Sequence, residues 1–298
     1  MQTSVPFDTS VELLIYAFIA LASLCIGLST TLANVTAILG DSRVVGRALT
    51  ANILLPPVLA GLIIAAFPLE PAAQTVLLLL AFAPGGINAV QFSTKVPGQI
   101  ASAGALLLLL SAVSLVTAPL AALTLLPPSA EVSVPLGEVA MRALGLIALP
   151  AMAGVALRRS SPELAEKLYK PVMLASLLAF IASVVLSTEA RQQGLAQLGS
   201  STTVAILIFI VALMAVGWLL GGPDTGGRQV LAVSTNLRNV GLVYVLVDGC
   251  CDDTLMEAAV LGFMALMVLP NLALTVGCAV WRKRHLTQRM TDSLSPAH

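Results

Sequence analysis

The sequence predicts an all-α polytopic membrane protein with about nine transmembrane helices. Of the 298 residues, 58% are hydrophobic and only 10% are charged, whereas a soluble domain has about 25% charged residues. The mean hydropathy is +0.97. A chain with so few polar side chains cannot coat a globule of this size, so the lipid bilayer is the solvent that fits it. We expect the spans to be helices, because a helix satisfies its own backbone hydrogen bonds in lipid.

Nine segments are long and apolar enough to cross a bilayer, which takes about 20 residues. Polar or proline-containing connections separate them, and none of these connections is long enough to hold a soluble domain. We therefore expect residues 1–298 to form one transmembrane transporter unit, with a cytoplasmic tail at 282–298. The expected spans are 11–33, 43–67, 72–95, 98–126, 136–157, 168–188, 201–221, 226–247 and 254–281.

The positions of Lys and Arg predict an orientation, because short cytoplasmic loops carry an excess of both. With the C-terminus inside, the loops and tail place twelve basic residues in the cytoplasm and only Arg191 outside. The prediction is a multi-pass protein of the inner (plasma) membrane with its N-terminus outside. Residues 1–10 contain no Lys or Arg, so we expect the first span to be a retained helix and not a signal peptide. Arg142, which lies within a span, is expected to pair with Glu138 on its own helix.

The composition also excludes several classes of protein. Lys plus Arg and Asp plus Glu both number 15, so there is no basic excess to bind a nucleic acid. Both histidines, His285 and His298, lie in the tail, and the four cysteines have no C-x-x-C spacing. The spans hold no catalytic motif and no paired carboxylates. We expect no enzyme activity, no metal centre and no cofactor, and the oligomeric state is not readable from the sequence.

The third span contains a Pro-Gly-Gly sequence that interrupts a helix. Pro84 lacks an N–H donor, and Gly85 and Gly86 loosen the backbone that follows. Unwound backbone inside a membrane is tolerated only where it is buried in protein or lines a wet cavity. The polar residues Asn88 and Gln91 beyond the break suit such a cavity. A proline-kinked structural helix is the other interpretation of this segment.

The eighth span holds the most polar cluster of any span, and we expect a second break there. An arginine at mid-membrane costs about 2.5–3.5 kcal/mol on insertion scales and is a functional candidate by default. A structural ion pair is the other interpretation of that arginine, although no acidic residue lies nearby in this span. The cluster consists of Ser234, Thr235, Asn236, Arg238, Asn239 and Gly241.

The two interrupted segments lie about 150 residues apart, at corresponding places in the two halves of the chain. Paired interruptions of this kind are typical of transporters built from inverted repeats. In such a fold the N-terminal ends of half-helices favour anions, and unwound carbonyl groups favour cations.

These segments resemble a known family. Pro84-Gly85-Gly86 and Arg238-Asn239-Val240-Gly241-Leu242 are similar to the signature residues of the two broken helices in the bile acid:sodium symporter family. Leu55-Pro56 and Ala118-Pro119 fit the same pattern, and the likeness runs from about residue 11 to residue 282. The resemblance implies inverted five-helix repeats with two broken helices that cross. The family's first helix is absent here, which leaves nine.

The resemblance also implies a core domain that moves against a panel domain. On this basis the helices around 72–126 and 226–281 form the core, and those around 11–67 and 136–188 form the panel. Relatives in bacteria move bile acids or other organic anions together with sodium.

The sodium ligands of the family are largely missing here. The acidic residue that binds sodium at both of the family's sites aligns with Ser234, and the glutamine four residues later aligns with Arg238. Hydroxyl ligands of the family align with Ala103 and Leu107. A hard cation such as sodium needs about six oxygen ligands, so a sodium role for Ser234, Thr235 and Asn236 is doubtful.

Five residues are candidates for substrate binding by the resemblance and by their polarity: Asn88, Gln91, Arg238, Asn239 and Asn271. Asn239 and Asn271 match asparagines of the family's substrate cavity, and Arg238 is predicted to contact an anion. Membrane Asn and Gln side chains also bridge helices, which is the other interpretation of Gln91 and Asn271.

The function hypothesis is a secondary active transporter that moves a small organic anion by alternating access without sodium coupling. The alternatives are a sodium-coupled symporter of bile-acid-like or organic acids and a transport-inactive binding relic or channel. An arsenite carrier of related fold ranks low, because Ala83 stands where those relatives have cysteine. The expected partners are the anion and the lipid bilayer.

Overall fold

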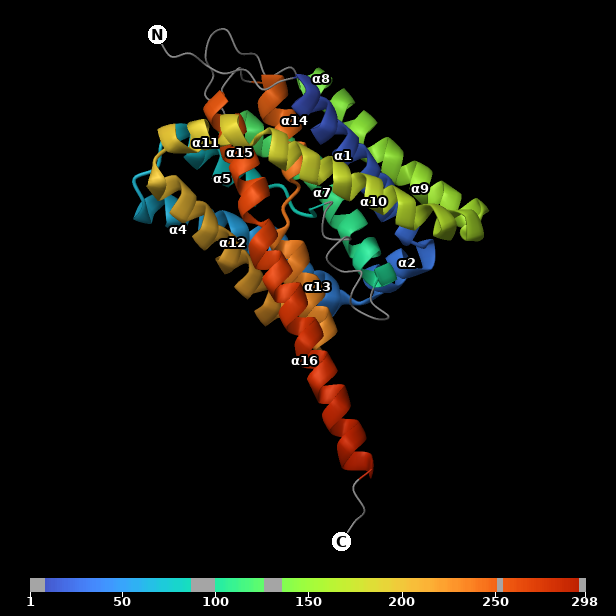
Figure 1. Ribbon diagram of the computed structural model, residues 1–298. Coiled ribbons are helices and arrows are strands. Elements are labelled where there is room, and N and C mark those ends of the chain that lie inside the picture. Colours follow the sequence, from blue (N-terminus) through green and yellow to red (C-terminus); the bar gives the residue numbers. More distant parts are fainter. Residues whose placement is uncertain (1–8, 87–99, 126–135, 251–253, 295–298) are drawn as a thin grey trace.

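The computed structural model describes residues 9–86, 100–125, 136–250 and 254–294, and every regular element in these ranges is helical (Figure 1). The elements are α1 Thr9–Ser29, α2 Leu32–Gly40, α3 Ser42–Leu49, the π-helical turn η1 Thr50–Leu54, α4 Leu55–Ala66, α5 Pro71–Ala81, α7 Ile100–Leu125, α8 Leu136–Ala143, the π-helical turn η2 Leu144–Ala148, α9 Leu149–Ser160, α10 Pro162–Leu186, α11 Thr188–Gln197, α12 Ser200–Leu220, α13 Thr225–Asn236, α14 Val240–Cys250, α15 Thr254–Leu266 and α16 Val268–Leu294.

Within the described ranges, eight helical segments are long and apolar enough to cross a membrane. The prediction of an all-α polytopic membrane protein is therefore confirmed. The third expected span, 72–95, begins as the shorter apolar helix α5, and its second half lies outside the described residues. The segments are Thr9–Ser29, Ser42–Ala66, Ala103–Leu125, Ala140–Ser160, Pro162–Leu186, Ser200–Leu220, Thr225–Asp248 and Thr254–Lys283.

The described helices pack in two groups, which we name the panel group and the core group after the division expected above. In the panel group, α1 packs mainly on α9 and α10, and α8 leads into α9 through η2. In the core group, α12 packs on α13 and α4, while α15 packs on α5, α11 and α14. Helix α7 contacts members of both groups, among them α1, α5 and α14.

The grouping differs from our prediction for one segment. We placed 43–67 with the panel, but its helix α4 packs against α5 and α12, and η1 packs against α13. The physical reason lies in Asn52, whose buried amide donates a hydrogen bond to Thr235 Oγ1 of α13 at 3.3 Å. A buried polar side chain needs a partner, and this one ties the segment to the core group.

Glycines allow α1 and α9 to pack closely within the panel group. A Cβ atom added to Gly27 would lie 2.8 Å from the Cα of Gly154, and one added to Gly154 would lie 2.7 Å from the backbone nitrogen of Leu28. Small residues at such contacts let two helix backbones approach, which is a main source of packing energy between helices in lipid.

A polar cluster joins the two groups near the end of the bundle where α8 and α14 lie (Figure 1). Arg142 of α8 forms an ion pair with Asp248 of α14, with 2.7 Å between Nη1 and Oδ2. The same Asp248 oxygen accepts a hydrogen bond from the Tyr16 hydroxyl of α1 at 2.7 Å. Arg142 was expected to pair with Glu138, whose side chain lies outside the described part. The described contacts show that Arg142 links the panel group to the core group.

Helix α16 continues past the other helices at the opposite end of the molecule (Figure 1). The tail that we expected to begin at residue 282 therefore starts inside this helix, which ends at Leu294.

A prediction follows for the contact between α1 and α9. The Gly27→Val substitution places two methyl groups against the backbone of α9, and overpacking of this kind costs about 1–3 kcal/mol. We expect a lower thermal unfolding midpoint in detergent. Gly61→Val on α4 is the matched control, because a Cβ atom there meets nothing within 4 Å. Equal midpoints for the two variants would contradict the close contact.

A second prediction concerns the link between Arg142 and Asp248. The pair is only half-buried, so we expect a coupling free energy of about 1 kcal/mol. It is measured by a double-mutant cycle with Arg142→Gln, Asp248→Asn and both together. Additive losses in the unfolding free energy would show that the ion pair contributes nothing to the joining of the two groups.

Candidate functional site: the crossing of the two interrupted helices

The first interruption follows α5. The helix ends at Ala81, and the chain from Ala83 to Gly86 is not helical. Gly85 has a φ of +78°, which is the left-handed region that glycine adopts without strain. The predicted break residues Pro84, Gly85 and Gly86 all lie in this stretch.

The second interruption consists of Leu237, Arg238 and Asn239, between the end of α13 and the start of α14. Asn239 precedes α14, and its side-chain oxygen accepts a hydrogen bond from the backbone N–H of Leu242 at 3.2 Å. This is the geometry of a helix N-cap, a position that asparagine favours. The chain therefore restarts a helix as soon as it passes Asn239.

Gly241, which we expected to be part of the break, lies inside α14. A Cβ atom at this position would lie 2.7 Å from the Ile19 Cγ1 atom of α1. The absence of a side chain at Gly241 thus allows α1 to approach α14. Gly241 does not interrupt the helix. The N-cap residue Asn239 lies two positions before it, so α14 has already begun at Val240.

The two interruptions touch each other. The backbone N–H of Asn239 donates a hydrogen bond to the carbonyl oxygen of Ala83 at 2.9 Å. Gly86 lies against the backbone of Leu237 and Arg238, where a Cβ atom would come within 2.8 Å of the Arg238 carbonyl oxygen. The non-helical stretches therefore cross at van der Waals distance, and only a glycine fits at position 86.

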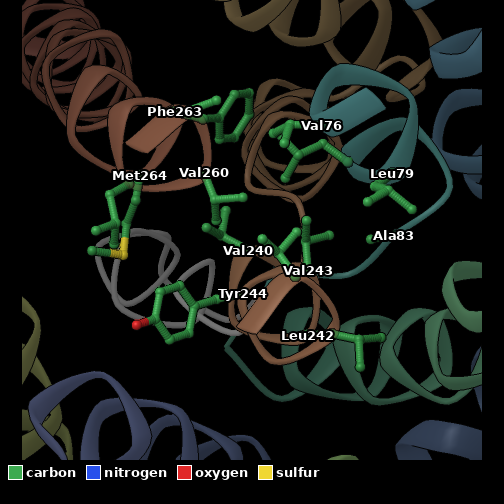
Figure 2. Close-up of a cluster of buried hydrophobic side chains, with 14 of the residues drawn as sticks. Val76, Leu79, Ala83, Val240, Leu242, Val243, Tyr244, Val260, Phe263 and Met264 are labelled. Carbon is green, nitrogen blue, oxygen red and sulfur yellow. The ribbon is translucent and has the colours of Figure 1, made fainter. Parts of the chain in front are cut away.

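Apolar side chains surround one side of this crossing. Figure 2 shows Val76 and Leu79 of α5 together with Val243 of α14 and Phe263 of α15, all of them buried. In such surroundings a backbone group without a hydrogen-bond partner is costly. The carbonyl groups released at the end of α5 must therefore find donors elsewhere in the protein.

Side chains and backbone from other helices supply those donors. The carbonyl oxygen of Phe82 accepts from the Thr117 hydroxyl at 2.6 Å, and that of Gly85 accepts from the Ser111 hydroxyl at 3.1 Å. Both hydroxyl groups belong to α7. The Ala83 carbonyl accepts from the backbone N–H of Asn239, as described above. The carbonyl of Ala81 accepts from Arg238, and that of Leu80 accepts from both Arg238 and the backbone N–H of Ala83.

The guanidinium of Arg238 makes five contacts with oxygen atoms. Its Nε donates to the Leu80 carbonyl at 2.8 Å, and its Nη2 donates to the carbonyls of Ala81 at 2.7 Å and Asn52 at 2.9 Å. Its Nη1 lies 3.4 Å from both the Asn52 side-chain oxygen and the Thr235 carbonyl. An arginine has five N–H donors, so all of them are used within the protein.

Proline chemistry explains why the Asn52 carbonyl is available. In an α-helix the N–H of residue 56 would bond to the carbonyl of residue 52, but Pro56 has no N–H. The backbone passes through the π-helical turn η1 just before this point, with the N–H of Leu55 bonded to Thr50. The released Asn52 carbonyl is then free to accept from Arg238.

The arrangement has the chemistry of a cation site. The acceptors of Leu80, Ala81 and Thr235 lie at the C-terminal ends of α5 and α13, where the helix dipole is negative and favours a cation. Carbonyl and amide oxygens are also the ligands that a hard metal cation prefers. Arg238, which is 1% exposed, therefore places a permanent positive charge among oxygen atoms that suit a metal ion.

We predicted that Arg238 contacts an anion, and its hydrogen bonds show what the guanidinium contacts in this structure. Because every N–H of the guanidinium lies within reach of a protein oxygen, none is directed at a ligand in this conformation. The charge remains at the crossing, but the side chain acts as an internal bridge between α5, η1 and α13.

The residues considered for ion coupling do not form an oxygen cage. The Ser234 hydroxyl donates to the Leu231 carbonyl of its own helix at 3.1 Å, and Thr235 Oγ1 accepts from Asn52. Ala103 and Leu107 are buried apolar residues. Within the described part of the chain, the nearby carbonyl oxygens are bound to Arg238, and the hydroxyl groups of Ser234 and Thr235 are bound to protein atoms.

Two asparagines have buried side-chain atoms without a partner in the described part of the chain: Asn236, next to the crossing in the sequence, and Asn271 of α16. Both side-chain atoms of Asn236 are buried and make no hydrogen bond with the described part of the chain, and the same holds for the Asn271 oxygen. The amide nitrogen of Asn271 donates to Met267, while that of Asn239 lies 3.4 Å from the Ser114 hydroxyl. Asn88 and Gln91 lie outside the described residues.

The sequence analysis missed several residues of this site. Asn52 was noticed only as a neighbour of a lost ligand, and Ser111 and Thr117 of α7 were not singled out. A signal was present for Asn52, because it lies four residues before Pro56 and its carbonyl is necessarily unpaired within the helix. No comparable signal marks Ser111 or Thr117, whose hydroxyl groups find their acceptors only through the packing of α7 on α5.

A comparison with protein-family models matches residues 17–198 to the Sodium Bile acid symporter family. The chain belongs to this family. The matched region begins within α1 and contains the first interruption, whereas Arg238 and the second interruption lie beyond it. A comparison with curated proteins found no match. The family consists of transporters, and the multi-pass helical structure agrees with that assignment.

The bridging role of Arg238 leads to a prediction about stability. Arg238→Met removes the described donor of two buried carbonyl groups, those of Ala81 and Asn52, and a carbonyl left without a partner costs about 1–3 kcal/mol. We expect the unfolding midpoint to fall sharply, and Arg238→Lys to recover part of the loss because it keeps the charge. Arg159→Met, at an exposed position of α9, is the control. An unchanged midpoint for Arg238→Met would rule out the bridge.

Proposed function

We propose that the protein is a secondary active transporter of a small organic anion and that it works without sodium. The observation that carries this proposal is the contact of the Arg238 guanidinium with five oxygen atoms at the crossing. In sodium-coupled relatives, by the resemblance described above, the aligned residues hold a mobile cation. Here the cation is covalently attached to the chain.

Electrostatics supports the loss of sodium coupling. Relative to the family pattern, a carboxylate is replaced by Ser234 and a neutral amide by Arg238, so the local charge changes by two units. A sodium ion entering this region would meet a fixed positive charge at short range, in surroundings where charges are poorly screened. The carbonyl oxygens that would have to bind it are already used.

The same geometry favours an anion beside the crossing. The N-terminal end of α14 carries the positive end of its helix dipole and begins at the crossing. All of the described hydrogen bonds of Arg238 go to neutral oxygen atoms, so its charge is not cancelled by a carboxylate. Asn236, Asn239 and Asn271 supply buried amide groups, and we propose that Asn88 and Gln91 complete the substrate site.

Two other functions belong to the same fold. A sodium-coupled symporter of bile-acid-like or organic acids is the ordinary activity of the family, and it requires that backbone carbonyls alone bind sodium here. A transport-inactive binding protein would keep the anion site but show no flux. We also propose the inner (plasma) membrane as the location, with the N-terminus outside and the C-terminus in the cytoplasm.

The decisive experiment measures ligand binding and flux with purified protein. Thermal unfolding is followed with small carboxylates, sulfonates and bile acids, each in sodium and in choline medium, because a ligand of the native state raises the midpoint. We expect at least one anion to raise the midpoint equally in both media and to show saturable counterflow in liposomes. A shift that occurs only in sodium would overturn the proposal, and a shift without counterflow would indicate a binding protein.

The proposal also predicts that sodium sensitivity can be introduced. The double substitution Ser234→Glu with Arg238→Gln returns a carboxylate and removes the fixed cation. We expect sodium, but not potassium, to raise the unfolding midpoint of this variant by about 2–4 °C, whereas the unaltered protein does not respond. Ser234→Gln with Arg238→Gln has the same shape without the carboxylate and is the control. A response of the unaltered protein to sodium would contradict the tethered cation.

A further inference from the structure

A cavity of about 530 Å3 lies away from the crossing, between α2 and α3 on one side and the connection from α12 to α13 on the other. Leu106 of α7 contributes to its lining. Helices α2 and α13 lie towards the end of the bundle from which α16 extends (Figure 1). The candidate substrate residues that the structure describes, Arg238, Asn239 and Asn271, do not line this cavity.

Two arginines of α3 line the cavity. Arg43 and Arg47 are four residues apart and therefore share one face of the helix. Neither side chain forms a hydrogen bond or an ion pair with the described part of the protein. The Arg47 guanidinium lies against Gly222, where a Cβ atom would come within 2.9 Å of Nη1. Gly222 has a φ of +94°, so both its backbone and the neighbouring guanidinium favour glycine here.

The carboxylates of the cavity do not cancel these charges by direct contact. Asp41 is the N-cap of α3 and accepts from the backbone N–H groups of Arg43 and Val44. Asp224 is the N-cap of α13 and accepts from the N–H of Gly227 at 2.6 Å. A third guanidinium, that of Arg228, donates to the Gly222 carbonyl at 2.8 Å. The cavity is therefore lined by two guanidinium groups that have no ionic partner among the described residues.

Much of the remaining lining is apolar, with Ile38, Leu220, Val230 and Leu231 beside Leu106. The cavity lies at the ends of three spans. The span Ser42–Ala66 begins one residue before Arg43, the span Ser200–Leu220 ends at Leu220 of the cavity lining, and the span Thr225–Asp248 begins one residue after Asp224 of the lining. The guanidinium groups are thus at the boundary between the apolar spans and water, which is the depth of lipid headgroups.

We propose that this cavity binds one anionic phospholipid, with its phosphate held by Arg43 and Arg47 and its acyl chains against the apolar lining. Arginine binds phosphate through parallel N–H donors, and basic residues at the end of a span attract anionic lipids. A free phosphate would use the same two arginines but gain nothing from the apolar lining. Because α2 connects α1 of the panel group to α3 beside the core group, a bound lipid would hold this connection against the α12–α13 loop.

The test uses the purified full chain in detergent and follows its thermal unfolding midpoint during titration. The three additives are dioleoyl phosphatidylglycerol, dioleoyl phosphatidylcholine and inorganic phosphate. Arg43→Gln with Arg47→Gln is the test variant. Arg158→Gln with Arg159→Gln is the matched control, since it removes the same charge from the last turn of α9.

We expect phosphatidylglycerol to raise the unfolding midpoint of the unaltered protein and of the control variant. The test variant should need at least about a tenfold higher lipid concentration for the same rise. An equal response of both double variants, or an equal effect of phosphatidylcholine, would overturn the proposal. An effect of phosphate alone that matches phosphatidylglycerol would also overturn it, in favour of a free anion. If the double variant does not fold, Arg47→Gln alone is titrated in the same way. No transport is measured, so the result is independent of the proposed transport activity.

Discussion

The centre of this structure depends on a buried cation that is held by carbonyl oxygens. The chain breaks two helices in apolar surroundings, and each break releases backbone groups that lipid cannot satisfy. Arg238 resolves part of this problem by donating to Leu80 and Ala81 at the end of α5 and to Asn52 in η1. The interaction is reciprocal, because a desolvated guanidinium needs those dipoles as much as the carbonyl groups need its donors.

We propose that this arrangement separates the protein from the sodium-coupled members of its family. The family match covers residues 17–198, which contain the first interruption, and Arg238 lies beyond it in the second. A charged side chain stabilises the surrounding carbonyl dipoles as a bound ion would. Because it is covalently attached, it cannot be released on the other side of the membrane. Under the proposed function, such a substitution keeps the crossing intact but leaves no bound ion whose gradient could drive transport. This is the physical basis of the sodium-independent function proposed here.

The contacts away from the centre differ in what they connect. The glycine contact between α1 and α9 holds the panel group together, whereas the cluster of Arg142, Asp248 and Tyr16 joins that group to α14. The cavity beside Arg43 and Arg47 lies where α2 passes from one group to the other. Transporters of this architecture work by relative motion of two helix groups, so the contacts between groups bear on function more directly than those within a group.

The membrane environment, the helical class and the two sites of interruption can be predicted from the sequence. These features follow from local chemistry, since composition decides the solvent, and a Pro-Gly-Gly run or a polar cluster within an apolar span weakens the helix there. The sequence also identified Arg238 as the costly residue that demanded an explanation.

The hydrogen-bond partners of Arg238 can be identified only in the tertiary structure. Its partner Asn52 lies 186 residues away in the chain, and no local pattern relates the two positions. The same holds for Arg142, whose described partner Asp248 is on a different helix, and for the segment 43–67, which packs with the core group. A local pattern shows that a backbone group is unpaired, but the atom that pairs with it is chosen by long-range packing.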